Sequence, residues 1–333
     1  MQTEILYDSF QRRVRSLRIS LTELCNFRCV YCTTSTTVIA PPSVHLTRSE
    51  ITRFVRIAGS LGISKIRLTG GEPLLRKDIC EIIRALKSIK TVEDLSITTN
   101  GSRLAEMLPA LKSAGLDRIN ISLDSMNAKR FQEVTLVDGF RDVMQSVFLA
   151  LEAGFPVKLN MVALKGLTRE EILEFVGLAQ SHPLDVRFLE FMPLCGEGWT
   201  PDLVLPIAEI RSLVQEHFEL EEIPRDDAPA QTFRLRSGKG QVGFIGSLTE
   251  SFCNQCSRIR LTADGNIRPC LFSETQVPIK TLLRENAPDE MIADAIREAV
   301  RIKPAGNAFR DKPFNPLEGT LRGAGPSIRK IGG

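Results

Sequence analysis

The first two thirds of the chain alternate short apolar runs with longer amphipathic stretches. The apolar runs are rich in Ile, Leu and Val and predict strands at about residues 15–21, 64–69, 94–98, 117–123, 156–162 and 184–190. The stretches between them have the length and periodicity of amphipathic helices. Six such repeats predict a parallel sheet with helices on its outer face.

Two of the expected helices begin with the sequence of a capping box. Thr47 is followed three residues later by Glu50, and Thr168 by Glu171. In this motif the hydroxyl and the carboxylate each accept a hydrogen bond from a backbone amide of the first turn. We therefore expect helices to start at both positions.

The alternation of strands and helices stops at about residue 195. Pro201, Pro206, Pro224 and Pro229 interrupt the region that follows, whose pattern is mixed. The sequence predicts an α/β protein with a partial (β/α)6 barrel of the TIM type over residues 1–195, and an α+β C-terminal region over residues 196–333. In such barrels the loops at the carboxyl ends of the strands converge on one cavity.

Composition and charge narrow the class of protein. The chain has 333 residues, of which 43% are hydrophobic and 25% charged, as is typical of globular proteins. Its net charge of +3 is too small to indicate a nucleic-acid surface. Neither a signal peptide nor a membrane-spanning run is visible. We expect a cytoplasmic protein without membrane or nucleic-acid partners, in which the eight Cys bind metal or stay free.

Three Cys follow the first expected strand in CxxxCxxC spacing: Cys25, Cys29 and Cys32. Three thiolates can hold a 4Fe-4S cluster and leave one iron open to a small molecule. An open metal position is what distinguishes a reactive site from a structural one. A structural zinc site is the alternative, and it would need a fourth ligand, for which His45 is the only nearby histidine.

A second Cys triplet lies near the other end of the chain. Cys253 and Cys256 form a CxxC, and Cys270 follows fourteen positions later. His217 is the only histidine after residue 195, so a zinc site here would need a carboxylate or a distant donor. Two separate triplets favour two clusters, each with one open iron.

Further motifs follow the next strands. In GGEP, Gly70 and Gly71 allow the backbone to approach a ligand closely, and Glu72 offers a carboxylate to an ammonium group. Ser122 and Asp124 end the fourth strand in the sequence SLD. Taken alone, GGEP can be an ordinary turn, and Ser and Asp are common at strand ends.

Together these motifs resemble those of the radical S-adenosylmethionine (SAM) superfamily. From about Asp8 to Gly333 the chain is identified as a member of the GTP 3',8-cyclase (MoaA) family, which opens molybdenum cofactor biosynthesis. The resemblance rests on LRISLTELCNFRCVYC, KIRLTGGEPLLRKDI, TTNG, RINISLDS, EFMPLCGEGW, FCNQCSRIRLTADGNIRPCLF and the terminal IGG. It implies a radical SAM barrel whose C-terminal extension carries a second iron–sulfur cluster.

The resemblance also implies roles for individual residues. The cofactors would be two 4Fe-4S clusters, one on each Cys triplet, and S-adenosyl-L-methionine. SAM would be bound by Tyr31, Gly71, Glu72, Ser122 and Met192. GTP would be bound by Arg18, Arg67, Thr98, Lys158, Arg258 and Arg260. Catalysis would involve Cys25, Cys29, Cys32, Arg258, Arg260, Gly332 and Gly333. The two glycines would belong to a tail that enters the barrel.

The implied reaction is radical chemistry on GTP. One electron from an external donor cleaves SAM, and the 5'-deoxyadenosyl radical removes hydrogen from ribose C3', which then bonds to guanine C8. The product is (8S)-3',8-cyclo-7,8-dihydroguanosine 5'-triphosphate. Cyclic pyranopterin monophosphate synthase would act next in the pathway, and a homodimer is an assembly state that the resemblance allows.

Some positions depart from the family pattern, and other functions stay open. Thr33 and Thr34 replace a usual Met-Pro, Ile328 replaces a Met, and Asn307 stands in place of a His. The alternatives are a radical SAM enzyme acting on a peptide or another small molecule, a non-catalytic iron–sulfur sensor, and a zinc-stabilised nucleic-acid binder. We interpret the remaining Cys80 and Cys195 as packing residues.

Overall fold

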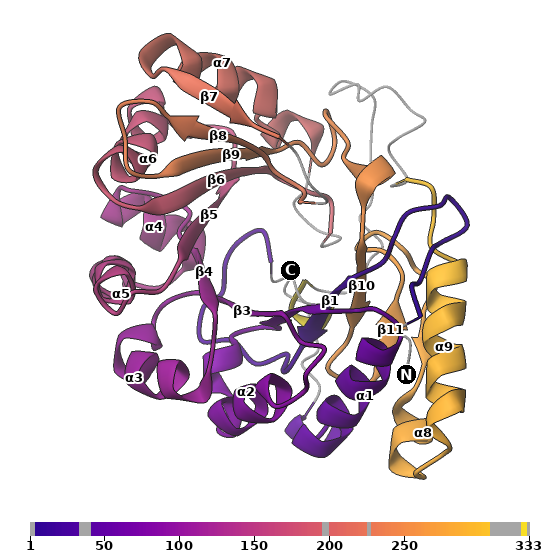
Figure 1. Ribbon diagram of the computed structural model, residues 1–333. Coiled ribbons are helices and arrows are strands. Elements are labelled where there is room, and N and C mark those ends of the chain that lie inside the picture. The colour runs from indigo at the N-terminus through magenta and orange to yellow at the C-terminus, as the bar shows by residue number, and fades with distance from the viewer. Residues whose placement is uncertain (1–3, 33–40, 195–199, 225–227, 307–327, 332–333) are drawn as a thin grey trace.

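One curved sheet of twelve strands organises the protein (Figure 1). The computed structural model describes residues 4–32, 41–194, 200–224, 228–306 and 328–331. The strand order is β12-β11-β10-β1-β2-β3-β4-β5-β6-β9-β8-β7. Helices α1 to α6 lie on the outer side of this curve, so that the inner side is left for loops and side chains (Figure 1).

The six strands expected from the apolar runs are confirmed, each within one residue of its expected bounds. They are β1 (Ser16–Ser20), β2 (Lys65–Thr69), β3 (Asp94–Thr99), β4 (Arg118–Ser122), β5 (Val157–Ala163) and β6 (Leu184–Glu190). Each pairs in parallel with the next along the chain. Their carboxyl ends therefore lie at one edge of the sheet.

The C-terminal region adds strands to both sides of this core. They are β7 (Leu220–Ile223), β8 (Gln231–Leu235), β9 (Gln241–Ile245), β10 (Arg258–Leu261), β11 (Asn266–Arg268) and β12 (Val277–Pro278). β10 pairs in parallel with β1, and β9 pairs in parallel with β6. The fold class, a partial barrel with a C-terminal α+β extension, is confirmed. The division into units 1–195 and 196–333 stays a prediction, and the sheet itself runs through both.

Ten α-helices are assigned among the described residues. They are α1 (Arg48–Ser60), α2 (Ile79–Lys87), α3 (Leu104–Ala114), α4 (Ala128–Thr135), α5 (Phe140–Glu152), α6 (Arg169–Ser181), α7 (Ile207–His217), α8 (Lys280–Arg284), α9 (Asp289–Arg301) and α10 (Ile328–Ile331). None of these described helices combines the length and apolarity needed to cross a membrane. Cys80 lies in α2, where it packs partly buried against the apolar core.

Of the two expected capping boxes, only the first is complete. Thr47 and Glu50 exchange both bonds at the start of α1. At the start of α6, Thr168 accepts from the amide of Glu171, but the Glu171 carboxylate accepts from the Ser125 hydroxyl and lies 3.6 Å from Arg130 Nε. The prediction of a second reciprocal box was wrong because tertiary partners compete for that carboxylate.

The parallel strands have an apolar outer face and a polar inner face. On β1, Leu17 and Ile19 are fully buried in the apolar core, whereas Ser16 and Arg18 line a cavity. Side chains alternate between the two faces of a strand, so this pattern recurs along the sheet. The inside of the curve is therefore lined by polar side chains and can bind a polar ligand.

Candidate functional site

Both Cys triplets line the same cavity. It measures about 250 Å³ and lies at the carboxyl ends of the parallel strands, where it is bounded by Thr69, Thr99 and Ser122. The expected residues that line it are Cys25, Cys29, Cys32, Cys253, Cys256, Cys270, Tyr31, Gly71, Ser122, Met192, Arg18, Arg67, Thr98, Arg258 and Arg260.

Pairing of β10 with β1 brings the two triplets together. Arg260 lies opposite Arg18 in the register, and Arg258 lies opposite Ser16. Cys256 lies two positions before the start of β10, and Cys25 lies in the loop after β1. One strand pairing thus places cysteines from opposite ends of the chain around a single space.

The GGEP motif supports the first Cys loop through its backbone. The amide of Gly71 donates to the carbonyl of Thr22 at 2.7 Å, and the amide of Glu72 donates to that of Leu24 at 2.7 Å. A Cβ atom on Gly71 would lie 2.2 Å from the Leu24 oxygen, and one on Gly70 2.4 Å from the Thr22 oxygen. Both glycines are needed because a side chain would collide with the segment that leads to Cys25.

Glu72, expected from the sequence to bind SAM, is absent from the described lining of the Cys cavity, and its role toward SAM stays a prediction. The residue is fully buried, and its oxygens accept from the Thr99 hydroxyl at 2.8 Å, the Leu74 amide at 2.9 Å and the Asn100 amide at 2.7 Å. Burial raises its pKa to about 7 against these hydrogen bonds. Glu72 is a positioning residue that joins the loop after β2 to the loop after β3.

Tyr31 is fixed beside the first triplet by Asp124. The phenol donates to one carboxylate oxygen at 2.6 Å, and the other oxygen accepts from the Val162 amide at 3.1 Å. Burial raises the pKa of Asp124 to about 6. The pair positions the aromatic ring within the loop that carries Cys29 and Cys32.

The two triplets have the chemistry that an iron–sulfur group requires. All six thiols are free and partly buried, and all face the cavity. Among the described residues, no three His, Cys, Asp or Glu side chains close on a single metal ion. Burial raises the pKa of Cys25 and, more strongly, of Cys29, so binding iron must displace protons from these thiols.

The second triplet has a different electrostatic environment. Burial alone would raise the pKa of Cys256, but the positive charges of Arg258 and Lys303 outweigh it and lower the pKa to about 6. The thiolate is the form of cysteine that binds metal, and this site already favours the thiolate of Cys256 in the absence of iron.

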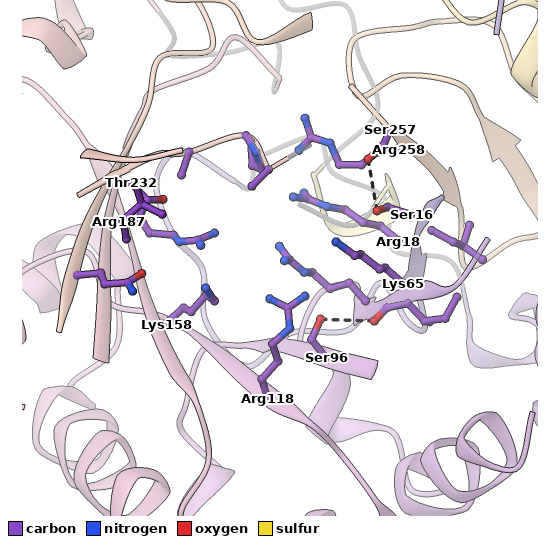
Figure 2. A pocket seen from close by; sticks show the side chains of 18 of the residues that line it. Ser16, Arg18, Lys65, Ser96, Arg118, Lys158, Arg187, Thr232, Ser257 and Arg258 are labelled. Atoms are coloured by element: carbon purple, nitrogen blue, oxygen red, sulfur yellow. Dashed lines mark hydrogen bonds between the residues drawn. The ribbon is translucent and has the colours of Figure 1, made fainter. Parts of the chain in front are cut away.

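A second cavity, of about 390 Å³, continues the interior toward the amino ends of the strands. None of the lining residues that the structure describes is acidic. Seven of them are cationic: Arg18, Lys65, Arg67, Arg118, Lys158, Arg187 and Arg258. Figure 2 shows Arg18 and Arg258 reaching into one space from the side opposite Lys158 and Arg187. The arrangement suits a ligand that carries several negative charges.

The cations of this second cavity lie close together, and their mutual repulsion contributes to lowering their pKa values. Burial, followed by the charge of Arg187, lowers the pKa of Lys158 to about 8, although Asp185 accepts from its ammonium at 2.5 Å. Burial and neighbouring arginines also lower the pKa of Arg67. A bound polyanion would relieve this repulsion.

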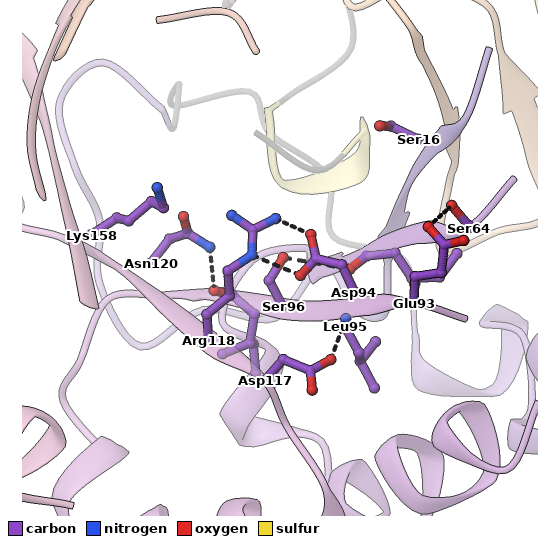
Figure 3. Close-up of polar contacts among 12 residues, drawn as sticks. Ser16, Ser64, Glu93, Asp94, Leu95, Ser96, Asp117, Arg118, Asn120 and Lys158 are labelled. Carbon is purple, nitrogen blue, oxygen red and sulfur yellow. Dashed lines mark hydrogen bonds and ion pairs between the residues drawn. The ribbon is translucent and has the colours of Figure 1, made fainter. Parts of the chain in front are cut away.

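Sequence reasoning missed three cations of this cavity: Lys65, Arg118 and Arg187. Figure 3 shows Arg118 held in place by Asp94, whose carboxylate accepts from Arg118 Nε at 2.7 Å. Lys65 could have been predicted from the sequence, because it lies two residues before Arg67 on the same strand and side chains two residues apart point to the same face. Lys158, which was expected to bind GTP, lines this second cavity and not the cavity that the cysteines line.

The two cavities form one continuous interior because they share lining residues. Arg18, Arg67, Arg187 and Arg258 line both. A molecule with an anionic end in the second cavity would extend toward the Cys triplets.

The last described helix enters this interior. The carbonyl of Ile331 accepts from Arg260 Nη1 at 3.3 Å, and Arg329 Nη2 donates to the carbonyl of Phe27 at 2.5 Å. Lys330 pairs with Asp264 at 2.8 Å. The predictions for Gly332 and Gly333 fall outside the described residues, as do those for Thr33, Thr34, Cys195 and Asn307.

Comparisons with known proteins agree with these features. The model of the radical SAM superfamily matches residues 19–179, and the model named Molybdenum Cofactor Synthesis C matches residues 184–309. A GTP 3',8-cyclase of Moorella thermoacetica is 42% identical over 90% of this chain and 94% of its own length. A mitochondrial GTP 3',8-cyclase of Arabidopsis thaliana is 45% identical over 92% of this chain and 80% of its own length.

Solved structures extend the agreement to the fold. The crystal structure of Streptococcus suis SuiB has a TM-score of 0.60 at 18% identity, covering 87% of this chain and 69% of that one. At this identity the likeness concerns the fold alone.

Proposed function

We propose a function from one premise: this chain belongs to the GTP 3',8-cyclase family of the radical SAM superfamily. The chain converts GTP to (8S)-3',8-cyclo-7,8-dihydroguanosine 5'-triphosphate with SAM, the first step of molybdenum cofactor biosynthesis. The observation that carries this proposal is that both Cys triplets line one cavity, which continues into a cavity of seven cations.

The two Cys triplets each hold a 4Fe-4S cluster in this proposal. Cys25, Cys29 and Cys32 would hold the first cluster, which would supply the electron that cleaves SAM so that its adenosyl group could take hydrogen from ribose C3'. C3' would then bond to guanine C8, and a second electron from the external donor, with a proton, would complete the 7,8-dihydro product. Tyr31, Gly71, Ser122 and Met192 surround SAM, since all four line the Cys cavity. Gly71 does so through its backbone.

GTP spans the two cavities. Its triphosphate occupies the cationic cavity, where Arg18, Arg67 and Lys158 donate to phosphate oxygens. The base then lies toward the second triplet, with Arg258, Arg260 and Thr98 around it. This placement brings ribose C3' between the two triplets, and such positioning is the main contribution of the protein to the rate.

The remaining family features are proposals of the same kind. Roles of Gly332 and Gly333 in catalysis belong to the proposal, and the carbonyl of Ile331, the last residue described before them, accepts from Arg260. An external donor supplies electrons, and cyclic pyranopterin monophosphate synthase consumes the product. The proposal also divides the chain into a barrel over residues 1–195 and an auxiliary-cluster region over residues 196–333. It includes assembly as a homodimer.

Deuterium transfer tests the proposed reaction. Anaerobically reconstituted protein is mixed with dithionite, SAM and GTP deuterated at C3'. We expect deuterium in 5'-deoxyadenosine and a cyclised GTP product by mass spectrometry. Production of 5'-deoxyadenosine without deuterium, and with GTP intact, would assign the chain to a radical SAM enzyme with another substrate.

Replacing Lys65 by Met separates triphosphate binding from SAM binding. Lys65 lines only the cationic cavity, so its loss removes a charged hydrogen-bond donor from the triphosphate. We expect GTP binding to weaken by about 1.5–3 kcal/mol, with SAM affinity unchanged, as measured by calorimetry on the cluster-loaded protein. The exposed Lys90, changed to Met, is the matched control. Equal GTP affinity in both variants would contradict the proposed orientation.

GTP binding should depend on pH through Lys158. Its pKa of about 8 in the free protein means that the ammonium is half-protonated near pH 8, predominates at lower pH and is progressively lost at higher pH. The triphosphate requires the charged form, so affinity should fall above pH 8, approaching about tenfold per pH unit. The triphosphate itself keeps a constant charge there because the second phosphate pKa is about 6.

Calorimetry at pH 8.5 in two buffers of different ionisation enthalpy measures this linkage directly. We expect GTP binding to take up protons in the parent protein. Lys158→Arg should take up fewer, because a guanidinium stays charged. Binding without proton uptake and with constant affinity up to pH 9.5 would show that Lys158 does not meet the triphosphate.

A further inference from the structure

Lys303 is a nearly fully buried lysine that the proposed reaction does not use. It follows α9, and only 3% of its surface is exposed. Its ammonium lies 3.4 Å from the Sγ atom of Cys256 and donates to the carbonyls of Arg258 at 2.9 Å and Pro269 at 3.0 Å. These three contacts use all three donors of an ammonium group.

The contacts of Lys303 join the two segments that carry the second Cys triplet. Arg258 follows Cys256 by two residues, and Pro269 immediately precedes Cys270. One side chain therefore bridges the CxxC loop and the strand end that supplies the third thiol. These contacts hold the segment of Cys256 and the segment of Cys270 at a fixed distance from each other.

The buried charge of Lys303 needs a negative partner. A lysine is almost never fully buried unless it is paired, and two carbonyl groups are neutral. Within the described part of the chain, no carboxylate forms an ion pair with it. The group that can carry the compensating charge is the sulfur of Cys256, which also lies 3.7 Å from Arg258 Nη2.

Cys25 of the first triplet has a different set of hydrogen-bond donors. The donors near the Cys25 sulfur are the Phe27 amide at 3.4 Å and the Asn100 side-chain amide at 3.8 Å, both neutral. The hydrogen-bond donors to sulfur thus differ between Cys25 and Cys256.

We propose that Lys303 is a positioning residue of the second cluster, which ties its two Cys segments together and raises its reduction potential by placing a positive charge against the Cys256 sulfur. Hydrogen bonds to the sulfur ligands and the surrounding charge both set the potential of an iron–sulfur cluster. Reduction adds one negative charge, so a fixed cation beside the sulfur stabilises the reduced state. This inference rests on the proposed second cluster.

A redox titration of the second cluster alone tests the inference. The full-length chain with Cys25, Cys29 and Cys32 changed to Ala is reconstituted, and its midpoint potential is followed by electron paramagnetic resonance. In this background we expect Lys303→Met to shift the potential to a more negative value and Lys303→Arg to keep it near the parent value. A purely structural role would not produce this dependence on charge.

Arg301→Met is the matched control. Arg301 lies two residues earlier and carries the same charge, but its side chain is 69% exposed and is paired with Glu298. We expect its loss to leave the potential unchanged, since solvent screens exposed charges. An equal shift for Arg301→Met and Lys303→Met would overturn the inference.

The remaining outcomes are also decisive. A Lys303→Met protein that holds about four iron and keeps the parent potential would overturn the inference and leave the second cluster intact. If Lys303→Met loses its iron while Lys303→Arg retains it, the charged tether is supported, whereas equal loss in both overturns it. A parent that binds no iron and sulfide would overturn the second cluster itself and the inference with it.

Discussion

Replacing Cys29 by Ala will abolish formation of 5'-deoxyadenosine from SAM and reduce the bound iron from about eight to about four per chain. Cys29 is the middle ligand of the first triplet, and burial raises the pKa of its thiol further than that of Cys25. With one of three ligands gone, the cluster that delivers the electron is lost. GTP binding should persist, because the cationic cavity contains no cysteine.

Iron and sulfide analysis after anaerobic reconstitution, with chromatography of the nucleoside products, measures this effect. Cys80→Ala is the control, since Cys80 is partly buried in α2 and lines neither cavity. We expect it to retain all the iron and the SAM cleavage. A Cys29→Ala protein that made 5'-deoxyadenosine at the parent rate would show that the first triplet does not hold the reactive cluster.

Replacing Arg12 by Ala will destabilise the fold by roughly 3–5 kcal/mol, the usual cost of removing one partner from a buried ion pair. Arg12 Nε donates to Asp8 at 2.6 Å, and the side chains are 6% and 0% exposed. The guanidinium also donates to the carbonyls of Cys253 at 2.7 Å, Pro304 at 2.6 Å and Ala305 at 2.8 Å. Its loss leaves the buried Asp8 carboxylate without this charged partner, although the backbone amides of residues 10 and 12 still donate to it.

Urea unfolding of the metal-free chain measures this loss of free energy. Arg13→Ala is the matched control, because Arg13 is the exposed neighbour of Arg12, and it should change stability by less than about 0.5 kcal/mol. Adding Asp8→Ala to Arg12→Ala should recover part of the loss, since no buried charge then stays unpaired. A small effect of Arg12→Ala, with no recovery in the double variant, would contradict the buried-pair explanation.

The local features of this protein could be predicted from the sequence because they depend on neighbours along the chain. The apolar runs that became β1 to β6 depend on residue types within a few positions, and all six strands were correctly placed. The CxxxCxxC spacing of Cys25, Cys29 and Cys32 is likewise a property of one loop. Cys253, Cys256 and Cys270 could also be recognised as a triplet, and the structure places both groups around one cavity.

The cationic cavity could be predicted only in part. Arg18, Arg67 and Lys158 were expected from family motifs, whereas Arg118 and Arg187 were not. Alternation along each strand places such residues on the inner face, but it does not say which strands face one another across the sheet. That choice depends on the curvature and register of the whole sheet.

Glu72 and Lys303 show what only the tertiary structure decided. Glu72 was expected to meet a ligand, and its carboxylate accepts from Thr99 at the end of β3, from Asn100 in the loop after β3 and from Leu74 in its own loop. Lys303 meets Cys256 from 47 residues away because α9 packs beside β11 and β12. The sequence by itself determined the six strands β1 to β6, the helical stretches between them and the two Cys triplets, since these are set by local spacing. The strand pairing of β10 with β1 decided the shared site, because contacts between distant segments arise only when the whole sheet has formed.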